Sequence, residues 1–236
     1  MNVITIILYS LCAGITIPIG SVLAAQSKKM GNLTTRSLVA HWVTAFGGGV
    51  LVAAVAFVLA PRAVENLSPL LLAISFLAGG VCLFFLDRSV ERAGGRVAQL
   101  VSMLMDYLPE ALSLGAVFAR HHDVALLLAI FIGLQNLPEA FNAHDDLIES
   151  GMTKKQSYII LFPLSVIGII AALVGYWTLS QHTGIVAFIM GFASGGILYL
   201  MFQDIAPLSH MPAKWIPALG ATIGFIFGMM GEKFIG

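Results

Sequence analysis

Charged residues are scarce in this sequence. Asp, Glu, Lys and Arg make up only 10% of its 236 residues, whereas they make up about a quarter of an ordinary soluble domain. Hydrophobic residues account for 58% of the chain, and the mean hydropathy is +0.94. A chain with so few charges cannot form the polar surface of a soluble globular protein. The composition therefore indicates an integral membrane protein surrounded by the lipid bilayer.

Cysteines and basic clusters are also few. The two cysteines, Cys12 and Cys82, lie in apolar runs, where a cysteine usually behaves as a small hydrophobic residue. The net charge is zero and no long run of Lys or Arg occurs, so we expect no nucleic-acid partner. The first apolar run, from Val3, lacks a preceding basic segment and is long enough to span a bilayer. We therefore expect a transmembrane helix there and no cleaved signal peptide.

Apolar runs follow one another along the whole chain. A helix needs about 20 apolar residues to cross the bilayer core. By this measure the sequence predicts eight transmembrane helices, at about residues 3–25, 37–60, 69–87, 97–119, 124–143, 157–180, 184–206 and 215–235. The segments between them are short, so we expect residues 1–236 to form a single all-α membrane domain.

Basic residues are distributed unevenly between the two ends of these spans. Lys and Arg are retained mainly on the cytoplasmic side of a membrane. The loops after odd-numbered spans hold nine of the twelve, namely Lys28, Lys29, Arg36, Arg88, Arg92, Arg96, Lys154, Lys155 and Lys214. The other three are Arg62, Arg120 and Lys233. This asymmetry predicts that both termini lie outside the cytoplasm, and we expect the membrane to be a bacterial inner membrane.

The chain contains two internal similarities. The stretches "MDYLPEALSLG" and "LQNLPEAFNAH" share Leu-Pro-Glu-Ala and place Glu110 and Glu139 in consecutive spans. More faintly, three residues of span two recur at the same offsets in span seven: Phe46, Gly49 and Pro61 correspond to Phe192, Gly195 and Pro207. Spans one to three and six to eight are therefore predicted to be inverted three-helix repeats on either side of spans four and five.

Three carboxylates lie well inside spans four and five, at Asp106, Glu110 and Glu139. An ionised carboxylate near the bilayer centre costs about 2.5–3.5 kcal/mol on insertion scales, which makes such residues candidates for function. Asp106 and Glu110 are four residues apart, as are Gln135 and Glu139. This spacing places each pair on one face of its helix.

Each of these pairs brackets a proline, Pro109 or Pro138. A proline inside a helix has no N–H and leaves the carbonyl four residues earlier without its partner, here at Met105 and Leu134. Oxygen donors on two neighbouring helices suit a divalent cation, whose charge offsets the repulsion between carboxylates. Ion pairing within the membrane is not expected, because no Lys or Arg lies in the apolar part of any span. Protonated carboxyls that join the two helices are the alternative.

These residues resemble the metal site of the ZIP (Zrt/Irt-like) family of divalent-metal transporters. Pro109 and Glu110 match the family's His-Asn-x-Pro-Glu motif of helix four, with Asp106 in the place of the histidine and Tyr107 in that of the asparagine. In helix five, the matching residues are Gln135, Asn136, Pro138 and Glu139. The resemblance covers essentially the whole chain and implies eight helices, outside termini and a homodimer.

The resemblance also implies a second site and a few differences. Asp87, Gln203 and Asp204 match residues of helices three and seven and would form a cytoplasmic exit site. Phe162 stands where helix six of the family has a glutamate before its proline, so a glutamate at position 162 is expected to add a ligand and tighten metal binding. The resemblance further implies that helices one, four, five and six slide against two, three, seven and eight.

We therefore predict a transporter that moves a divalent cation into the cytoplasm by alternating access, most simply Zn²⁺, with Fe²⁺, Mn²⁺ and Cd²⁺ as further candidates. The predicted ligands are Asp106, Glu110, Gln135 and Glu139, with Asn136 as a weaker one, and no prosthetic group is expected. The alternative is a membrane protein of the same fold that binds or senses metal without turnover. An enzyme is not expected, since the Gly-x-Gly-Asp pattern of intramembrane aspartyl proteases is absent from the sequence.

Overall fold

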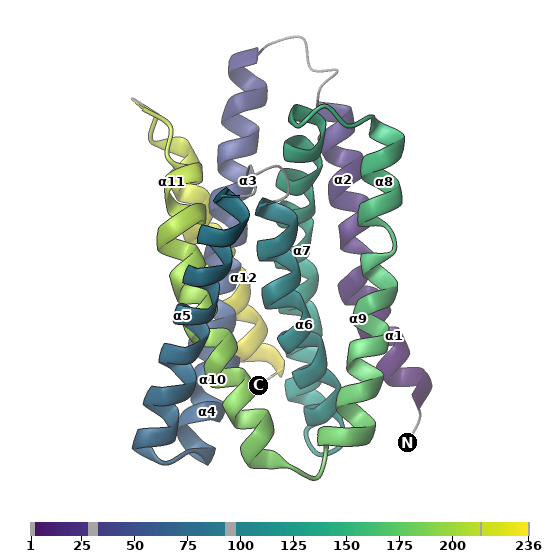
Figure 1. Cartoon of the computed structure of the whole chain (residues 1–236), viewed down its shortest axis with the longest axis vertical. Coiled ribbons are helices and arrows are strands. Elements are labelled where there is room, and N and C mark those ends of the chain that lie inside the picture. Colours follow the sequence, from purple (N-terminus) through teal and green to yellow (C-terminus); the bar gives the residue numbers. More distant parts are fainter. Residues whose placement is uncertain (1–2, 28–32, 93–97, 213, 236) are drawn as a thin grey trace.

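The computed structural model of the chain describes residues 3–27, 33–92, 98–212 and 214–235 and is helical almost throughout (Figure 1). Three of the basic residues used above, Lys28, Lys29 and Arg96, lie outside these residues. Within them the structure contains no β-strand, which confirms the all-α prediction. The elements are α1 Val3–Gly14, α2 Thr16–Ser27, α3 Leu33–Ala54, η1 Val55–Leu59, α4 Ala60–Asn66, α5 Pro69–Arg92, α6 Ala98–Phe118, α7 His122–Glu149, α8 Lys154–Leu161, α9 Leu164–Val174, η2 Gly175–Leu179, α10 Thr183–Leu200, η3 Met201–Ile205, α11 Ala206–Ser209 and α12 Ile216–Ile235.

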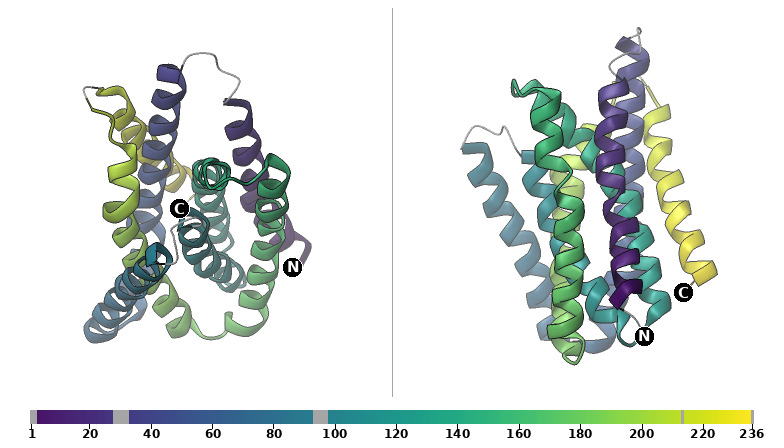
Figure 2. Two further views of the ribbon diagram at one scale, coloured as in Figure 1. Left: turned by 45° about the horizontal axis from the view of Figure 1, so that its top comes forward. Right: turned by 90° about the vertical axis from the view of Figure 1, so that its right-hand side faces the viewer.

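Seven helical segments of the described chain are long and apolar enough to cross a membrane: Val3–Ser27, Thr34–Asn66, Pro69–Val90, His122–Glu149, Lys154–Leu179, Thr183–Ser209 and Ile216–Ile235. The protein is therefore built as an all-α membrane protein. The predicted fourth span corresponds to α6, which has 21 residues and is not among the seven. It packs between α7 and α9. The start of α1 and the end of α12 lie toward the same end of the bundle (Figures 1 and 2).

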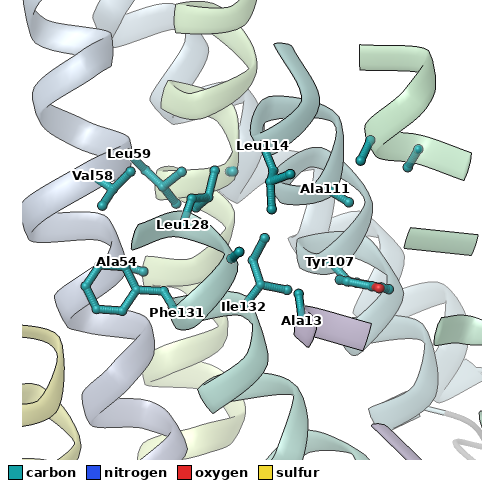
Figure 3. Close-up of a cluster of buried hydrophobic side chains, with 14 of the residues drawn as sticks. Ala13, Ala54, Val58, Leu59, Tyr107, Ala111, Leu114, Leu128, Phe131 and Ile132 are labelled. Atoms are coloured by element: carbon teal, nitrogen blue, oxygen red, sulfur yellow. The ribbon is translucent and has the colours of Figure 1, made fainter. Parts of the chain in front are cut away.

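The long helix α7 lies at the centre of the packing. Its residues Leu128, Phe131 and Ile132 are buried between side chains of α3 and η1 on one side and of α6 on the other (Figure 3). By contrast, α5 and α12 lie at opposite edges of the bundle (Figure 2, right) and bury the smallest share of their residues among the candidate spans. The apolar side chains that these two helices expose suit contact with lipid.

Glycines join α3 to α12 and α5 to α10 by direct contact of their backbones. A Cβ atom added at Gly49 of α3 would overlap the carbonyl oxygen of Ala221 in α12. One added at Gly195 of α10 would overlap the carbonyl oxygen of Phe76 in α5. Such close approach is possible only for glycine, and it is typical of tightly packed membrane helices. We call α3, η1, α4, α5, α10, η3, α11 and α12 the glycine-locked bundle.

A second set of helices is joined in the same way. A Cβ atom at Gly20 of α2 would overlap the carbonyl oxygen of Leu137 in α7, and one at Gly115 of α6 would overlap that of Ala172 in α9. We call α1, α2, α6, α7, α8, α9 and η2 the carboxylate bundle, because it holds Asp106, Glu110 and Glu139.

Where a glycine of one bundle faces the other bundle, its neighbours there are side-chain atoms and not backbone atoms. A Cβ atom at Gly47 of α3 would lie 2.5 Å from Cγ of Pro138 in α7, and one at Gly228 of α12 would lie 2.7 Å from Cε1 of Phe131. Among the described glycines, every approach closer than 3.0 Å to a backbone atom of another helix falls within one bundle. Gly49 and Gly195 thus lie inside the glycine-locked bundle, whereas Gly47 meets the other bundle.

Two π-helical segments occupy matching places in the chain. Segment η1 interrupts the helix that contains α3 and α4, and η3 interrupts the helix that contains α10 and α11. Their bounds, Val55–Leu59 and Met201–Ile205, are separated by 146 residues at both ends. Each segment is followed two residues later by a proline, Pro61 or Pro207. The two helices run through the bundle in opposite directions (Figure 1).

Candidate metal centre

The predicted ligands meet between α6 and α7 in the interior of the carboxylate bundle. Asp106 and Glu110 lie one turn apart on α6, and Gln135 and Glu139 lie one turn apart on α7. All four side chains are buried, and none is more than 6% exposed. Gln135 Nε2 donates a hydrogen bond to Glu110 Oε2. The carboxyl groups of Asp106 and Glu110 are both close enough to Glu139 to interact with its charge. The two Leu-Pro-Glu-Ala stretches therefore face each other.

Several oxygens of this cluster have no hydrogen-bond partner among the described residues. They are Glu110 Oε1, Gln135 Oε1, Asn136 Oδ1 and both carboxylate oxygens of Glu139. A buried polar atom without a partner is costly, and its presence in a native site calls for a ligand or water. Carboxylate and amide oxygens are the ligands that hard and borderline divalent cations accept. The chemistry of the donors therefore fits a divalent cation.

The negative charges of the cluster are not balanced by basic side chains. The ion pairs found within the described ranges, Arg36–Asp145 and Arg62–Glu65, do not involve it. Asp106 instead accepts a hydrogen bond of 2.8 Å from the backbone N–H of Tyr107 at Oδ1. Carboxylates this close cannot all stay charged without a proton or a cation between them.

The cluster is not closed around one point in this structure. Among the residues described, no group of three or more His, Cys, Asp or Glu side chains is arranged to hold a metal ion. Asp106, Glu110 and Glu139 are neighbours, but a common coordination sphere requires their side chains to turn toward one another. Neither oxygen of Glu139 accepts a hydrogen bond from a donor in the described chain, and its carboxyl already lies beside that of Asp106.

The two prolines lie inside helices that continue past them, Pro109 in α6 and Pro138 in α7. Because neither has an N–H, the carbonyls of Met105 and Leu134 lack the usual partner four residues later. The ring of Pro138 packs against Gly47 of α3, so this turn of α7 faces the glycine-locked bundle. The site therefore lies one turn from the contact between the two bundles.

Tyr107 borders the cluster, whereas Phe162 lies on the exposed side of its helix. The Tyr107 side chain is buried, and its hydroxyl fills the space beside Gly14 of α1 and Gly168 of α9, where a Cβ atom would collide with it. Phe162 is 39% exposed, and its ring packs 5.1 Å from that of Tyr158. The buried positions of this region, such as Leu161 and Leu164, lie on the opposite face. Residue 162 therefore faces outward, and a glutamate there would not reach the cluster as the sequence suggested.

Asn136 connects the site to the start of the chain. Its Nδ2 donates a hydrogen bond of 3.2 Å to the carbonyl oxygen of Ala13, which precedes the break between α1 and α2 at Ile15. The side chain is fully buried, and its Oδ1 remains without a partner in the described residues. Asn136 can therefore hold α1 in place with its nitrogen and still offer an oxygen.

The residues of the predicted exit site lie near the end of α5, at Asp87, and in η3, at Gln203 and Asp204. Asp87 and Asp204 are half-buried and close enough for their charges to interact. Gln203 is exposed and lines a surface groove with Phe84 and Phe202. The structure thus brings together the two aspartates, while Gln203 faces the surface groove.

Sequence reasoning missed a buried polar group at the end of α7. His144 and Ser157 are both fully buried, and Ser157 Oγ lies 2.8 Å from His144 Nδ1. Next to them, Asp145 forms an ion pair of 3.3 Å with Arg36. The burial of His144 makes it a contact between α7 and α8, which only a tertiary structure shows.

The comparison with known proteins adds no relative on which to base an assignment. No model of a protein family matches the chain, and no curated protein matches it.

Proposed function

We propose that this protein is a ZIP-type transporter that moves a divalent transition-metal cation across a membrane into the cytoplasm, with Zn²⁺ as the first candidate substrate. The observation that carries the proposal is the group of unpartnered oxygens on Glu110, Gln135 and Glu139, buried between two proline-containing helices. Ionisable residues inside a membrane domain usually mark an ion pathway. Asp106 is proposed as the fourth ligand and Asn136 as a weaker one.

The division into two bundles supports transport by alternating access. Backbone contacts of glycine hold each bundle together, and the glycine contacts between the bundles use side chains. Two rigid bodies that meet through side chains can slide or rock against each other while a site near their contact opens to each side in turn. We propose that the carboxylate bundle moves, that the glycine-locked bundle is the scaffold, and that α6 is the eighth transmembrane helix.

The proposed inverted repeat is supported by features other than sequence identity. The π-helical segments η1 and η3 are 146 residues apart, and Gly49 and Gly195 share that offset. Each glycine approaches the backbone of a helix in the other proposed repeat. Gly49 of the first repeat meets α12 of the second, and Gly195 of the second repeat meets α5 of the first. Equivalent elements thus make equivalent contacts while running in opposite directions. We propose Asp87 and Asp204 as an exit site, and the exposed faces of α5 and α12 as the surfaces for lipid or a second copy.

The alternative proposal is a protein that binds metal without transporting it. The packing of Tyr107 between Gly14 and Gly168 favours it, because the side chain in the place of the family's asparagine is taken up by contacts between helices. Uptake of ⁶⁵Zn²⁺ into proteoliposomes, measured with equilibrium binding on the same preparation, tests both proposals. A transporter accumulates the ion inside the vesicles, and Glu110→Gln prevents this. Stoichiometric binding without accumulation would support the alternative of a metal-binding protein. If zinc is neither bound nor accumulated, the metal site is refuted.

A further inference from the structure

A cavity of about 170 Å³ lies at the end of the bundle where the termini are found, between α4, the end of α6 and the start of α10. It is separate from the carboxylate cluster and shares no residue with it. Its wall is formed by both bundles, since α4 and α10 belong to the glycine-locked bundle and α6 to the carboxylate bundle. Its lining combines the basic residues Arg62 and Arg120 with the polar residues His121, Ser180 and Thr183.

The presence of two arginines in this cavity is unexpected from the charge distribution of the chain. Only three of the twelve Lys and Arg residues belong to the predicted outer side, namely Arg62, Arg120 and Lys233. Two of these three line the same cavity, although they are 58 positions apart in the sequence. Basic residues are disfavoured on the outer side of a membrane protein. Their convergence on one cavity therefore needs a local reason.

The neighbours of the arginines do not neutralise them fully. Arg62 forms an ion pair of 3.6 Å with Glu65, which is 62% exposed and also lines the cavity. Arg120 donates a hydrogen bond of 3.1 Å to the neutral amide of Gln181. With one carboxylate against two guanidinium groups, the lining keeps a net positive charge when His121 is neutral. Each guanidinium has further N–H groups that can donate to an anion.

The deeper part of the cavity is apolar. Ala116, Val117, Val186, Ala187 and Met190 form it, and all of them are buried. We propose that the cavity binds a small organic anion, whose carboxylate or phosphate group pairs with Arg62 and Arg120 and whose short apolar part contacts this floor. An inorganic anion of the same charge would use the arginines but not the floor.

If the proposed transport function holds, occupation of this cavity also affects the approach of the metal. A positive lining at the outer end repels a divalent cation, and this repulsion slows its association. A bound anion cancels the charge. The binding of the anion itself does not depend on metal transport, so it can be tested on the purified protein without metal.

The test measures the thermal unfolding of the full chain in a neutral detergent, with hexanoate, hexanol and inorganic phosphate as probes. We expect hexanoate to raise the melting temperature saturably, hexanol to have no effect, and phosphate to bind more weakly than hexanoate. Arg62→Gln and Arg120→Gln should each weaken hexanoate binding at least about tenfold, as expected for loss of one charge-assisted contact. Glu65→Gln should strengthen it, because the competing carboxylate is gone. Lys233→Gln is the matched control and should change nothing.

The source of the anion is distinguished in nanodiscs. If the hexanoate effect persists in phosphatidylcholine but disappears in phosphatidylglycerol, an anionic lipid headgroup occupies the cavity. If it persists in both, the ligand is a free anion. The proposal is overturned if hexanoate has no saturable effect, if hexanol or phosphate matches it, or if both arginine variants bind like the Lys233→Gln control. None of these outcomes bears on the metal site, whose failure would appear as loss of zinc binding.

Discussion

Replacement of Glu139 by glutamine distinguishes a metal-binding role of this residue from a structural one. The substitution keeps the size of the side chain and removes one charge from the cluster with Asp106 and Glu110. Neither carboxylate oxygen of Glu139 accepts a hydrogen bond from a donor among the described residues, and a glutamine can keep the contact with the Asp106 carboxyl. If Glu139 binds metal, the loss of its charge should weaken binding by about 2–5 kcal/mol, the range for removal of one partner of a buried charge pair. This corresponds to a roughly 30- to 4,000-fold higher Kd.

The same substitution should stabilise the metal-free protein. Two like charges about 5 Å apart repel each other by roughly 3 kcal/mol at an effective dielectric constant of 20, and protonation relieves part of this. We therefore expect a gain of about 1 kcal/mol and a higher melting temperature for Glu139→Gln without metal. Binding is measured by isothermal titration with Zn²⁺ and stability by thermal unfolding, both in the same detergent.

Asn142→Ala provides the control one turn further along α7. Asn142 exchanges hydrogen bonds of 3.0 and 3.2 Å with Thr44 of α3. Loss of the Asn142 side chain should reduce the free energy of unfolding by about 1 kcal/mol, and so lower the melting temperature, while zinc affinity stays unchanged. The change in melting temperature is thus expected to be positive for Glu139→Gln and negative for Asn142→Ala. A Glu139→Gln protein that binds zinc like the wild type, or that is less stable without metal, would refute the role of Glu139 as a ligand and favour a protonated contact between helices.

Four further predictions can be tested on the same preparation. Phe162→Glu should leave zinc affinity within about twofold of wild type, because residue 162 faces outward; tighter binding in titration calorimetry would contradict this. Gly49→Ala and Gly195→Ala should each lower stability by at least about 1–3 kcal/mol, since an added methyl group overlaps a carbonyl oxygen; unchanged melting temperatures would show that the helices can separate freely. Zinc affinity should fall as the pH is lowered from about 8 to about 5, because protons compete with the cation for the carboxylates; a flat titration profile would exclude carboxylate ligands. Cysteines at Arg88 and Asp123, in a background without native cysteines, should react with an impermeant reagent from opposite sides of the membrane; labelling from one side would refute the alternation of the spans.

The pairing of the two Leu-Pro-Glu-Ala stretches could be predicted from the sequence because both signals are local. A spacing of four residues places Asp106 with Glu110, and Gln135 with Glu139, on one face of a helix. The short connection between the two spans then makes α6 and α7 neighbours. The structure places these four side chains together, as expected from that spacing.

The orientation of Phe162 and Tyr107 could not be predicted, because each depends on a distant part of the chain. Pro163 separates α8 from α9, but the buried positions Leu161 and Leu164 keep a helical spacing across it and leave Phe162 on the other side. The pocket of Tyr107 exists only because Gly14 and Gly168, from two other helices, leave room for its hydroxyl. Likewise, α7 continues six residues beyond the predicted end at residue 143. It can do so because His144 finds a hydrogen-bonding neighbour in Ser157 of α8.

The π-helical segment η1 makes the start of α4 tolerant of a change in chain length. A π-helical turn closes its hydrogen bonds one residue later than an α-helical turn and so contains one additional residue. The wider turn takes up this residue without rotating the helix that follows. Deletion of a single residue from Val55–Leu59 would therefore restore an α-helical turn and leave α4 in nearly the same orientation, whereas a deletion within an α-helical stretch rotates all that follows by about 100°. Arg62 would then still face the cavity that it lines. Because η3 carries an additional residue at the equivalent place, the proposed repeat predicts the same tolerance of a single deletion within Met201–Ile205.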